Sequence, residues 1–138
     1  EIEMTCLDNG EPSHVTIQHI LISFDGGLPG SSKVIPRNQR GAEKLAKEVL
    51  ERAKAGEDFN LLVKELTDDS PPGIYRMANF DQEVFMEGKD QDQWIRPRTG
   101  LVKGFGDVGF SLEVGEIGMA EYNTSASPYG WHIIKRLK

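Results

Sequence analysis

Two histidines stand within strand-like stretches near opposite ends of this chain. His19 lies among aliphatic residues at positions 16–24, and His132 lies in an aromatic and β-branched run that starts at Trp131. Such residues favour β-strands, in which alternate side chains share one face, so His132 lies on the same face as Ile134. Each imidazole is either an ordinary hydrogen-bonded core residue or a polar group offered to a ligand. Because both strands carry one, we expect the two strands to be neighbours in one sheet.

The residue types give little support to other catalytic reactions or to metal binding. A hydrolase would need a nucleophile elbow or a cysteine paired with a histidine, and neither pattern is present. The single cysteine, Cys6, lies in a polar leader, and one cysteine excludes an internal disulfide framework. The three histidines have neither helical nor Cys-x-x-Cys-type spacing, so the sequence predicts no metal site.

Length and charge limit the possible partners. With 138 residues, of which 38% are hydrophobic, the chain has enough apolar material for one domain with one core. A formal charge of −6 and a pI near 5.1 argue against nucleic acid or an anionic membrane as the partner. No apolar run approaches the ~20 residues that span a bilayer, and no signal peptide opens the sequence. The sequence leaves both a cytoplasmic and an extracytoplasmic location open.

Two helices are predicted after the first strand. Apolar residues recur at helical spacing from 38 to 56, with Asn38 as the N-cap and Gly56 suited to the left-handed residue after the helix. A second helix is capped by Asp58 and ends before the two prolines at 71–72, which cannot continue it.

The remaining elements are shorter. Residues 73–78 and 117–122 predict strands, and residues 104–112 predict a short helix. This order is typical of an α+β domain with a small, mainly antiparallel sheet. Residues 1–14 are polar and aperiodic, so we expect a tail or linker that is partly disordered, and His14 within it receives no role.

The motifs around the two histidines resemble a known family. His-Ile-Leu-Ile at 19–22 and Ser-Pro-Tyr-Gly-Trp-His-Ile-Ile at 127–134 look like the two signature strands of the parvulin-type peptidyl-prolyl cis-trans isomerases. The resemblance covers residues 15–138, which we treat as one domain. It implies a four-stranded, mainly antiparallel sheet flanked by three to four helices. It also implies a monomer that acts on proline-containing polypeptides and rotates the X-Pro bond without any cofactor.

The family's site residues carry over position by position. In parvulins the two signature histidines face each other beneath the bound peptide, and here they are His19 and His132. The acidic or thiol residue after the second helix corresponds to Asp69, in Thr-Asp-Asp-Ser. The family's substrate-binding positions, which include its apolar proline pocket, correspond to Leu101, Phe105, Phe110, Ser127 and Tyr129.

Each of these residues also has an ordinary structural interpretation. Without the resemblance, Leu101, Phe105 and Phe110 would be core residues and Asp69 a turn or cap residue. The alternative function is a non-catalytic parvulin-like module that binds extended peptides, as in a chaperone. We favour the enzyme because the histidines, Asp69 and both phenylalanines are present together.

Two departures from the family pattern affect specificity. The chain is longer than compact members, with the surplus within residues 81–96, and we expect this insertion to lie on the outer wall or the rim of the substrate groove. The loop at 23–30 contains no lysine or arginine, whereas phosphate-directed parvulins have a basic cluster there. The sequence therefore predicts an isomerase that does not require a phosphorylated residue. Arg96 and Arg98 could reverse this prediction if the insertion folds back over the groove.

Overall fold

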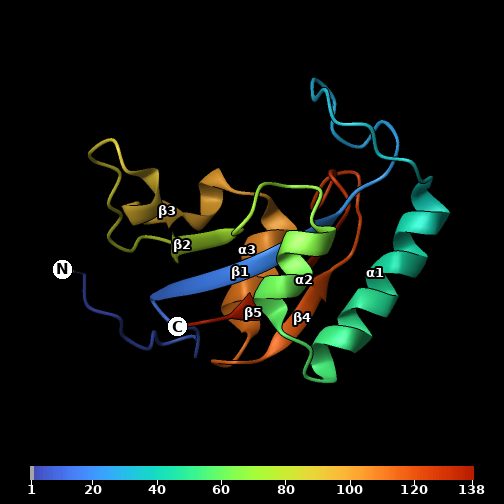
Figure 1. Cartoon of the computed structure of the whole chain (residues 1–138). Helices are drawn as coiled ribbons and strands as arrows, with labels where there is room; N and C mark the ends of the chain where they lie inside the picture. The colour runs from blue at the N-terminus through green and yellow to red at the C-terminus, as the bar shows by residue number, and fades with distance from the viewer. Residues whose placement is uncertain (1) are drawn as a thin grey trace.

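The fold is a five-stranded sheet with helices on both faces. The computed structural model describes residues 2–138. The strands are β1 (His14–Ile22), β2 (Ile74–Ala78), β3 (Arg96–Pro97), β4 (Ile117–Ala120) and β5 (Trp131–Arg136), in the order β3-β2-β1-β5-β4. The helices are α1 (Gln39–Lys54), α2 (Phe59–Leu66) and α3 (Lys103–Ser111), with short 3₁₀ turns at Gln91–Gln93 and Arg98–Gly100. In Figure 1, α1 and α2 lie on one side of the sheet and α3 on the other.

β1 lies at the centre of the sheet, and its side chains point alternately into two hydrophobic cores, one on each face. Ile20 and Ile22 face α1 and α2 and pack there with Trp131 and Ile133 of β5. Ile17 faces the other way and packs with α3. Since His19 is two residues from Ile17, it also points to the α3 face.

The first and last strands are neighbours, as expected from their histidines. β1 and β5 pair antiparallel, with Leu21 opposite His132 and His19 opposite Ile134. All four side chains therefore lie on the α3 face, which brings the two imidazoles to adjacent positions.

The helix boundaries follow the predicted caps. The Asn38 side chain accepts a hydrogen bond from the Gly41 N–H at 2.8 Å, and Asp58 accepts one from the Leu61 N–H at 3.1 Å. Gly56 adopts φ +100°, the left-handed region predicted for it after α1. None of the helices in residues 2–138 is long and apolar enough to cross a membrane.

The predicted α+β fold with a small, mainly antiparallel sheet is confirmed, and the sheet has five strands instead of the four expected. The insertion folds back on itself, because Phe85 and Ile95 exchange two backbone hydrogen bonds of 2.6 and 3.0 Å. The chain leaving this pair runs parallel to β2 and forms β3, with Arg96 opposite Met77. The fifth strand could not be anticipated from residues 81–96 because they show no strand periodicity.

The residues before β1 make contacts with the rest of the domain. Ser13 is buried, and its carbonyl accepts from the Asn79 N–H at 2.8 Å. His14, which received no role from the sequence, begins β1 and is buried. Its ring nitrogens lie 2.8 Å from the Ser13 hydroxyl and 2.7 Å from the Glu83 carbonyl oxygen. His14 therefore ties the start of the sheet to the insertion.

Candidate active site

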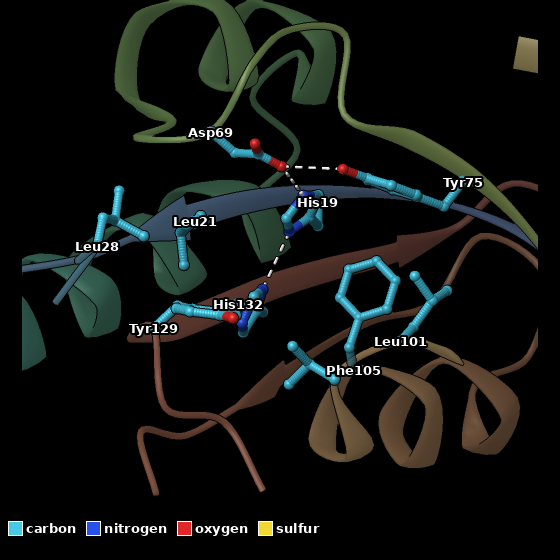
Figure 2. A pocket seen from close by; sticks show the side chains of 10 residues that line it. His19, Leu21, Leu28, Asp69, Tyr75, Leu101, Phe105, Tyr129 and His132 are labelled. Atoms are coloured by element: carbon cyan, nitrogen blue, oxygen red, sulfur yellow. Dashed lines mark hydrogen bonds and ion pairs between the residues drawn. The ribbon is translucent and has the colours of Figure 1, made fainter. Parts of the chain in front are cut away.

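A cavity of about 260 Å³ lies on the α3 face of the sheet, where β1 and β5 meet the start of α3. Figure 2 shows the two histidines on the sheet side, Asp69 and Tyr75 above them, and Phe105 with Leu101 opposite. The lining consists of residues His19, Leu21, Leu28, Asp69, Tyr75, Leu101, Val102, Phe105, Tyr129 and His132.

One hydrogen-bonded chain joins four of these side chains. His19 and His132 approach through their Nδ1 atoms at 3.1 Å, with ring planes 18° apart. The other nitrogen of His19, Nε2, lies 3.0 Å from Asp69 Oδ2. The Tyr75 hydroxyl donates to the same oxygen at 3.0 Å. The chain therefore runs Tyr75–Asp69–His19–His132.

Asp69 is held in its ionised form. The hydrogen bond from His19 lowers the pKa of Asp69 to about 2 and outweighs burial, which acts in the opposite direction. Burial, followed by the adjacent Asp69 charge and the hydrogen bond to it, raises the pKa of Tyr75 to about 12. A carboxylate and a phenol therefore face each other at neutral pH, and the phenol is the donor.

His132 is held neutral. Burial, assisted by the neighbouring His19, lowers the pKa of His132 to about 3. With Asp69 ionised, His19 donates its Nε2–H to the carboxylate. Between the two Nδ1 atoms one ring donates and the other accepts, and the remaining ring nitrogen of His132 is Nε2. That Nε2 is the one buried side-chain polar atom of residues 2–138 that has no partner.

Phe105 forms the apolar side opposite the histidines. Its ring is buried and packs edge-on against His19, Tyr75 and His132, with centroid distances of 4.9, 5.4 and 5.5 Å. This aromatic packing fixes the two imidazoles from the side that faces α3. Leu101 and Val102, just before α3, extend the same apolar surface.

The structure brings six of the eight sequence-predicted residues to the cavity. Phe110 and Ser127 do not line it. Phe110 is buried beneath Arg98, whose guanidinium lies 4.6 Å from its ring centroid. Ser127 is buried in the turn before β5, where its backbone N–H and C=O both pair with Asn123. Its hydroxyl occupies the space that a β-carbon on Gly104 would fill, so these two residues set how closely α3 approaches the turn.

Sequence reasoning did not select four lining residues, of which Tyr75 matters most. Leu21 could have been found from strand alternation, because it shares a face with His19. Tyr75 could be assigned to the cavity only once the register of β2 was known, because that register places it opposite Ile17 on the same face. Leu28 reaches the cavity through the fold of the loop after β1, and Val102 lies at the N-cap of α3. No group of three or more His, Cys, Asp or Glu side chains in the described chain is placed to hold a metal ion.

A family model and a curated relative match this chain. Residues 4–138 match the family model described as the PPIC-type PPIASE domain. The foldase protein PrsA 4 of Bacillus cereus is 34% identical over 93 residues, which are 67% of this chain and 27% of that protein. The chain thus spans about a quarter of the length of this relative.

Solved structures share the fold. The structure of PrsA from Bacillus subtilis superposes with a TM-score of 0.54 at 24% identity, over 91% of this chain and 35% of that one. The solution structure of TbPIN1 superposes with a TM-score of 0.60 at 20% identity, over 91% of this chain and 98% of that one. The structure of the peptidyl-prolyl isomerase ESS1 from Candida albicans superposes with a TM-score of 0.60 at 20% identity, over 97% of this chain and 66% of that one.

Proposed function

Because the chain belongs to the PPIC-type peptidyl-prolyl cis-trans isomerase family, we propose that its cavity binds a proline ring and lowers the barrier to rotation about the preceding amide. That barrier is ~18–20 kcal/mol in water, since rotation breaks the amide resonance. The enzyme therefore has to favour the twisted amide over the planar one, without forming a covalent bond to it.

One observation carries the proposal: an apolar cavity is bordered on one wall by a continuous hydrogen-bonded chain. Phe105 and Leu101 offer the surface that suits a pyrrolidine ring, and their contact excludes water from the amide carbonyl. Water stabilises the polar planar amide more than the twisted one, so its removal favours rotation. His19, His132 and Asp69 supply fixed polar groups beside the bond, and their mutual hydrogen bonds remove the cost of orienting them during the reaction.

The state of Asp69 supports a non-covalent mechanism. Its Oδ2 accepts from both His19 and Tyr75, so the lone pairs of that oxygen are engaged by donors. A carboxylate held in this way is a poor nucleophile and a good anchor for an imidazole. We assign Asp69 to hold His19 in one orientation and not to attack the substrate.

We further propose that a phosphorylated residue before proline is not required. Arg37, after the loop, donates to Asp68 Oδ2 at 2.6 Å, and Lys33 Nζ donates to the Asp68 carbonyl at 2.7 Å. Arg98 is buried and donates to Asp107 Oδ1 at 2.7 Å. These three cations already have acceptors, which leaves no basic cluster in the loop that could clamp a dianion. The net charge of −6 also opposes phosphate binding.

The proposed client is an unphosphorylated polypeptide that contains proline, and the proposed role is to assist protein folding. A matched panel of Ser-Pro, phospho-Ser-Pro, Glu-Pro, Ala-Pro and Leu-Pro peptides tests both activity and specificity. We expect the uncharged peptides to be turned over at least as well as the phosphopeptide, measured by exchange NMR. A tenfold preference for phospho-Ser-Pro, equal to ~1.4 kcal/mol of transition-state binding, would overturn the specificity claim. Binding of the peptides without faster exchange would instead favour the non-catalytic module.

A further inference from the structure

A second cavity of about 380 Å³ lies beside the first, between the start of β2 and the insertion. One side is formed by the segment 70–76, and the other by Gln91, Asp92, Trp94 and Arg96 of the insertion. Tyr75 lines both cavities, and Figure 2 shows it at the edge of the first one, above Phe105. The two cavities are therefore adjacent at Tyr75.

The second cavity runs along an open strand edge. β3 pairs with β2 at Met77 and Ala78 and leaves the outer edge at Ile74 uncovered. His19 N–H donates to the Gly73 carbonyl, which directs the groups of Gly73 toward β1. Because backbone groups alternate along a strand, those of Ile74 and Arg76 point outward. In the register of Met77 with Arg96, β3 takes the Arg76 carbonyl, so the N–H and C=O of Ile74 and the N–H of Arg76 lie along the second cavity. An uncovered edge of this kind is a template for an added strand.

The same cavity carries positive charge in a negatively charged protein. The Arg96 guanidinium lies over the Trp94 ring at 5.0 Å and donates to Gln91 Oε1 at 3.2 Å. Arg76 donates to the Gln93 carbonyl at 3.3 Å. Within residues 2–138 neither arginine forms an ion pair, and Asp92 is the only acidic side chain in the lining of this cavity. The lining has a net charge of about +1, whereas the whole chain has −6.

We propose that the second cavity is a substrate subsite that takes an acidic, extended segment flanking the proline. The segment adds as a strand to the edge of β2 at Ile74 and the Arg76 N–H, and a Glu or Asp side chain pairs with Arg96 above Trp94. This inference rests on the proposed function, because it extends the polypeptide whose proline occupies the first cavity. It concerns residues beyond Tyr75, so it does not require an acidic or phosphorylated residue next to the proline.

The test compares peptides that fill one cavity with peptides that reach both. A short, uncharged Ala-Pro peptide is the reference, and it is extended by four residues on its N-terminal or its C-terminal side. Each extension carries Glu, Gln or Lys at the same position, and kcat/KM is measured for the 138-residue chain at low salt. On one of the two sides we expect the Glu peptide to exceed the Gln peptide by threefold or more, with Lys poorer than Gln.

Substitutions of Arg96 assign the effect to this site. In Arg96→Gln the Glu/Gln ratio of kcat/KM should fall to about one, and in Arg96→Glu the Lys peptide should become the best of the three. A fold defect would lower kcat/KM for the Glu, Gln and Lys peptides together and leave their ratios unchanged. A reversed preference requires a direct contact between residue 96 and the peptide. Lys89→Gln is the matched control, because it makes the same charge change within the insertion but outside the cavity lining, and it should keep the wild-type ratio.

The outcomes separate this inference from the proposed function. Isomerisation of the short peptide, with equal rates for Glu, Gln and Lys extensions on both sides, would eliminate the subsite and leave the isomerase intact. Failure to isomerise any peptide would defeat the proposed function and the subsite with it. Strand addition is tested by N-methylation of successive amides in the Glu extension, since only alternate amides should face β2. Equal losses at every amide, or none at any, would contradict the paired strand.

Discussion

His19 and His132 are 113 residues apart in the chain, and their Nδ1 atoms lie 3.1 Å apart in the folded protein. The contact places one imidazole, which also reaches Asp69, directly against a second that has no other partner. Protonation of either ring would change the hydrogen bond between them, so the protonation states of the pair are central to how the site works.

The first prediction concerns the stability of the fold at acidic pH. Because the pKa of His132 is lowered to about 3 in the folded protein, the unfolded chain binds this proton first, from about pH 6.5 downward. Stability should therefore fall as pH drops from 6.5 toward 3, by at most ~1.4 kcal/mol per pH unit for this proton. Asp69 acts in the same direction: its contribution is present above its unfolded pKa and is lost as pH falls toward 2.

Two measurements check this behaviour. The ring carbons and nitrogens of His132 should keep neutral chemical shifts by NMR down to pH 5. The free energy of unfolding in urea should decrease between pH 7 and pH 4, and His132→Phe should flatten that slope. Normal titration of His132 near pH 6.5 would contradict the prediction.

The second prediction assigns a function to Tyr75. In Tyr75→Phe, Asp69 loses one of its two side-chain donors while the aromatic ring against Phe105 remains. The pKa of Asp69 should rise, and kcat/KM should fall roughly three- to tenfold, which corresponds to the ~0.5–1.5 kcal/mol of a typical hydrogen bond. The carboxyl titration by NMR and the exchange rate measure the two effects. Tyr122→Phe is the control, since Tyr122 packs against Phe24 and Trp131 on the opposite face and should leave both unchanged.

The third prediction ranks two cavity residues. Phe105→Ala should lower kcat/KM more than His19→Asn, because it removes the apolar surface for the proline ring. Burial of such a ring is worth ~1.5–3 kcal/mol, or roughly 10- to 150-fold in rate. The exchange assay decides the order once NMR has shown that both variants are folded. A larger loss in His19→Asn would mean that the polar network, and not the apolar wall, dominates the chemistry.

The fourth prediction tests the insertion. Since Phe85 and Ile95 already pair through two backbone hydrogen bonds, residues 86–94 can be replaced by a short glycine-containing turn. The sheet should persist, because the buried Ile95 and strand β3 remain. Activity on a short Ala-Pro peptide should stay within about twofold, while the advantage of a Glu-extended peptide should shrink, because the deletion keeps Arg96 but removes Trp94 and Gln91, which hold its guanidinium in place. Global unfolding of this deletion by circular dichroism would show that the insertion is part of the core.

The sequence by itself determined the central pair of strands and the caps of the helices. Strand alternation predicts which side chains share a face with His19 and His132. The two imidazoles can meet only if the strands that carry them are adjacent in the sheet. Asn38 and Asp58 cap α1 and α2 as predicted, because a cap depends on residues within one helical turn. Local chemistry of this kind is readable from a single sequence.

Tertiary structure alone decided which residues complete the cavity. Tyr75 reaches Asp69 because β2 pairs with β1 in the register that sets Tyr75 opposite Ile17. Phe110 occupies a predicted position but packs under Arg98, because the turns of α3 direct Phe105 and Phe110 to different neighbours. β3 exists because two segments of the insertion pair with each other and carry Arg96 to the edge of β2. Register, helix rotation and loop closure are set by contacts between residues distant in sequence, and no local pattern encodes them.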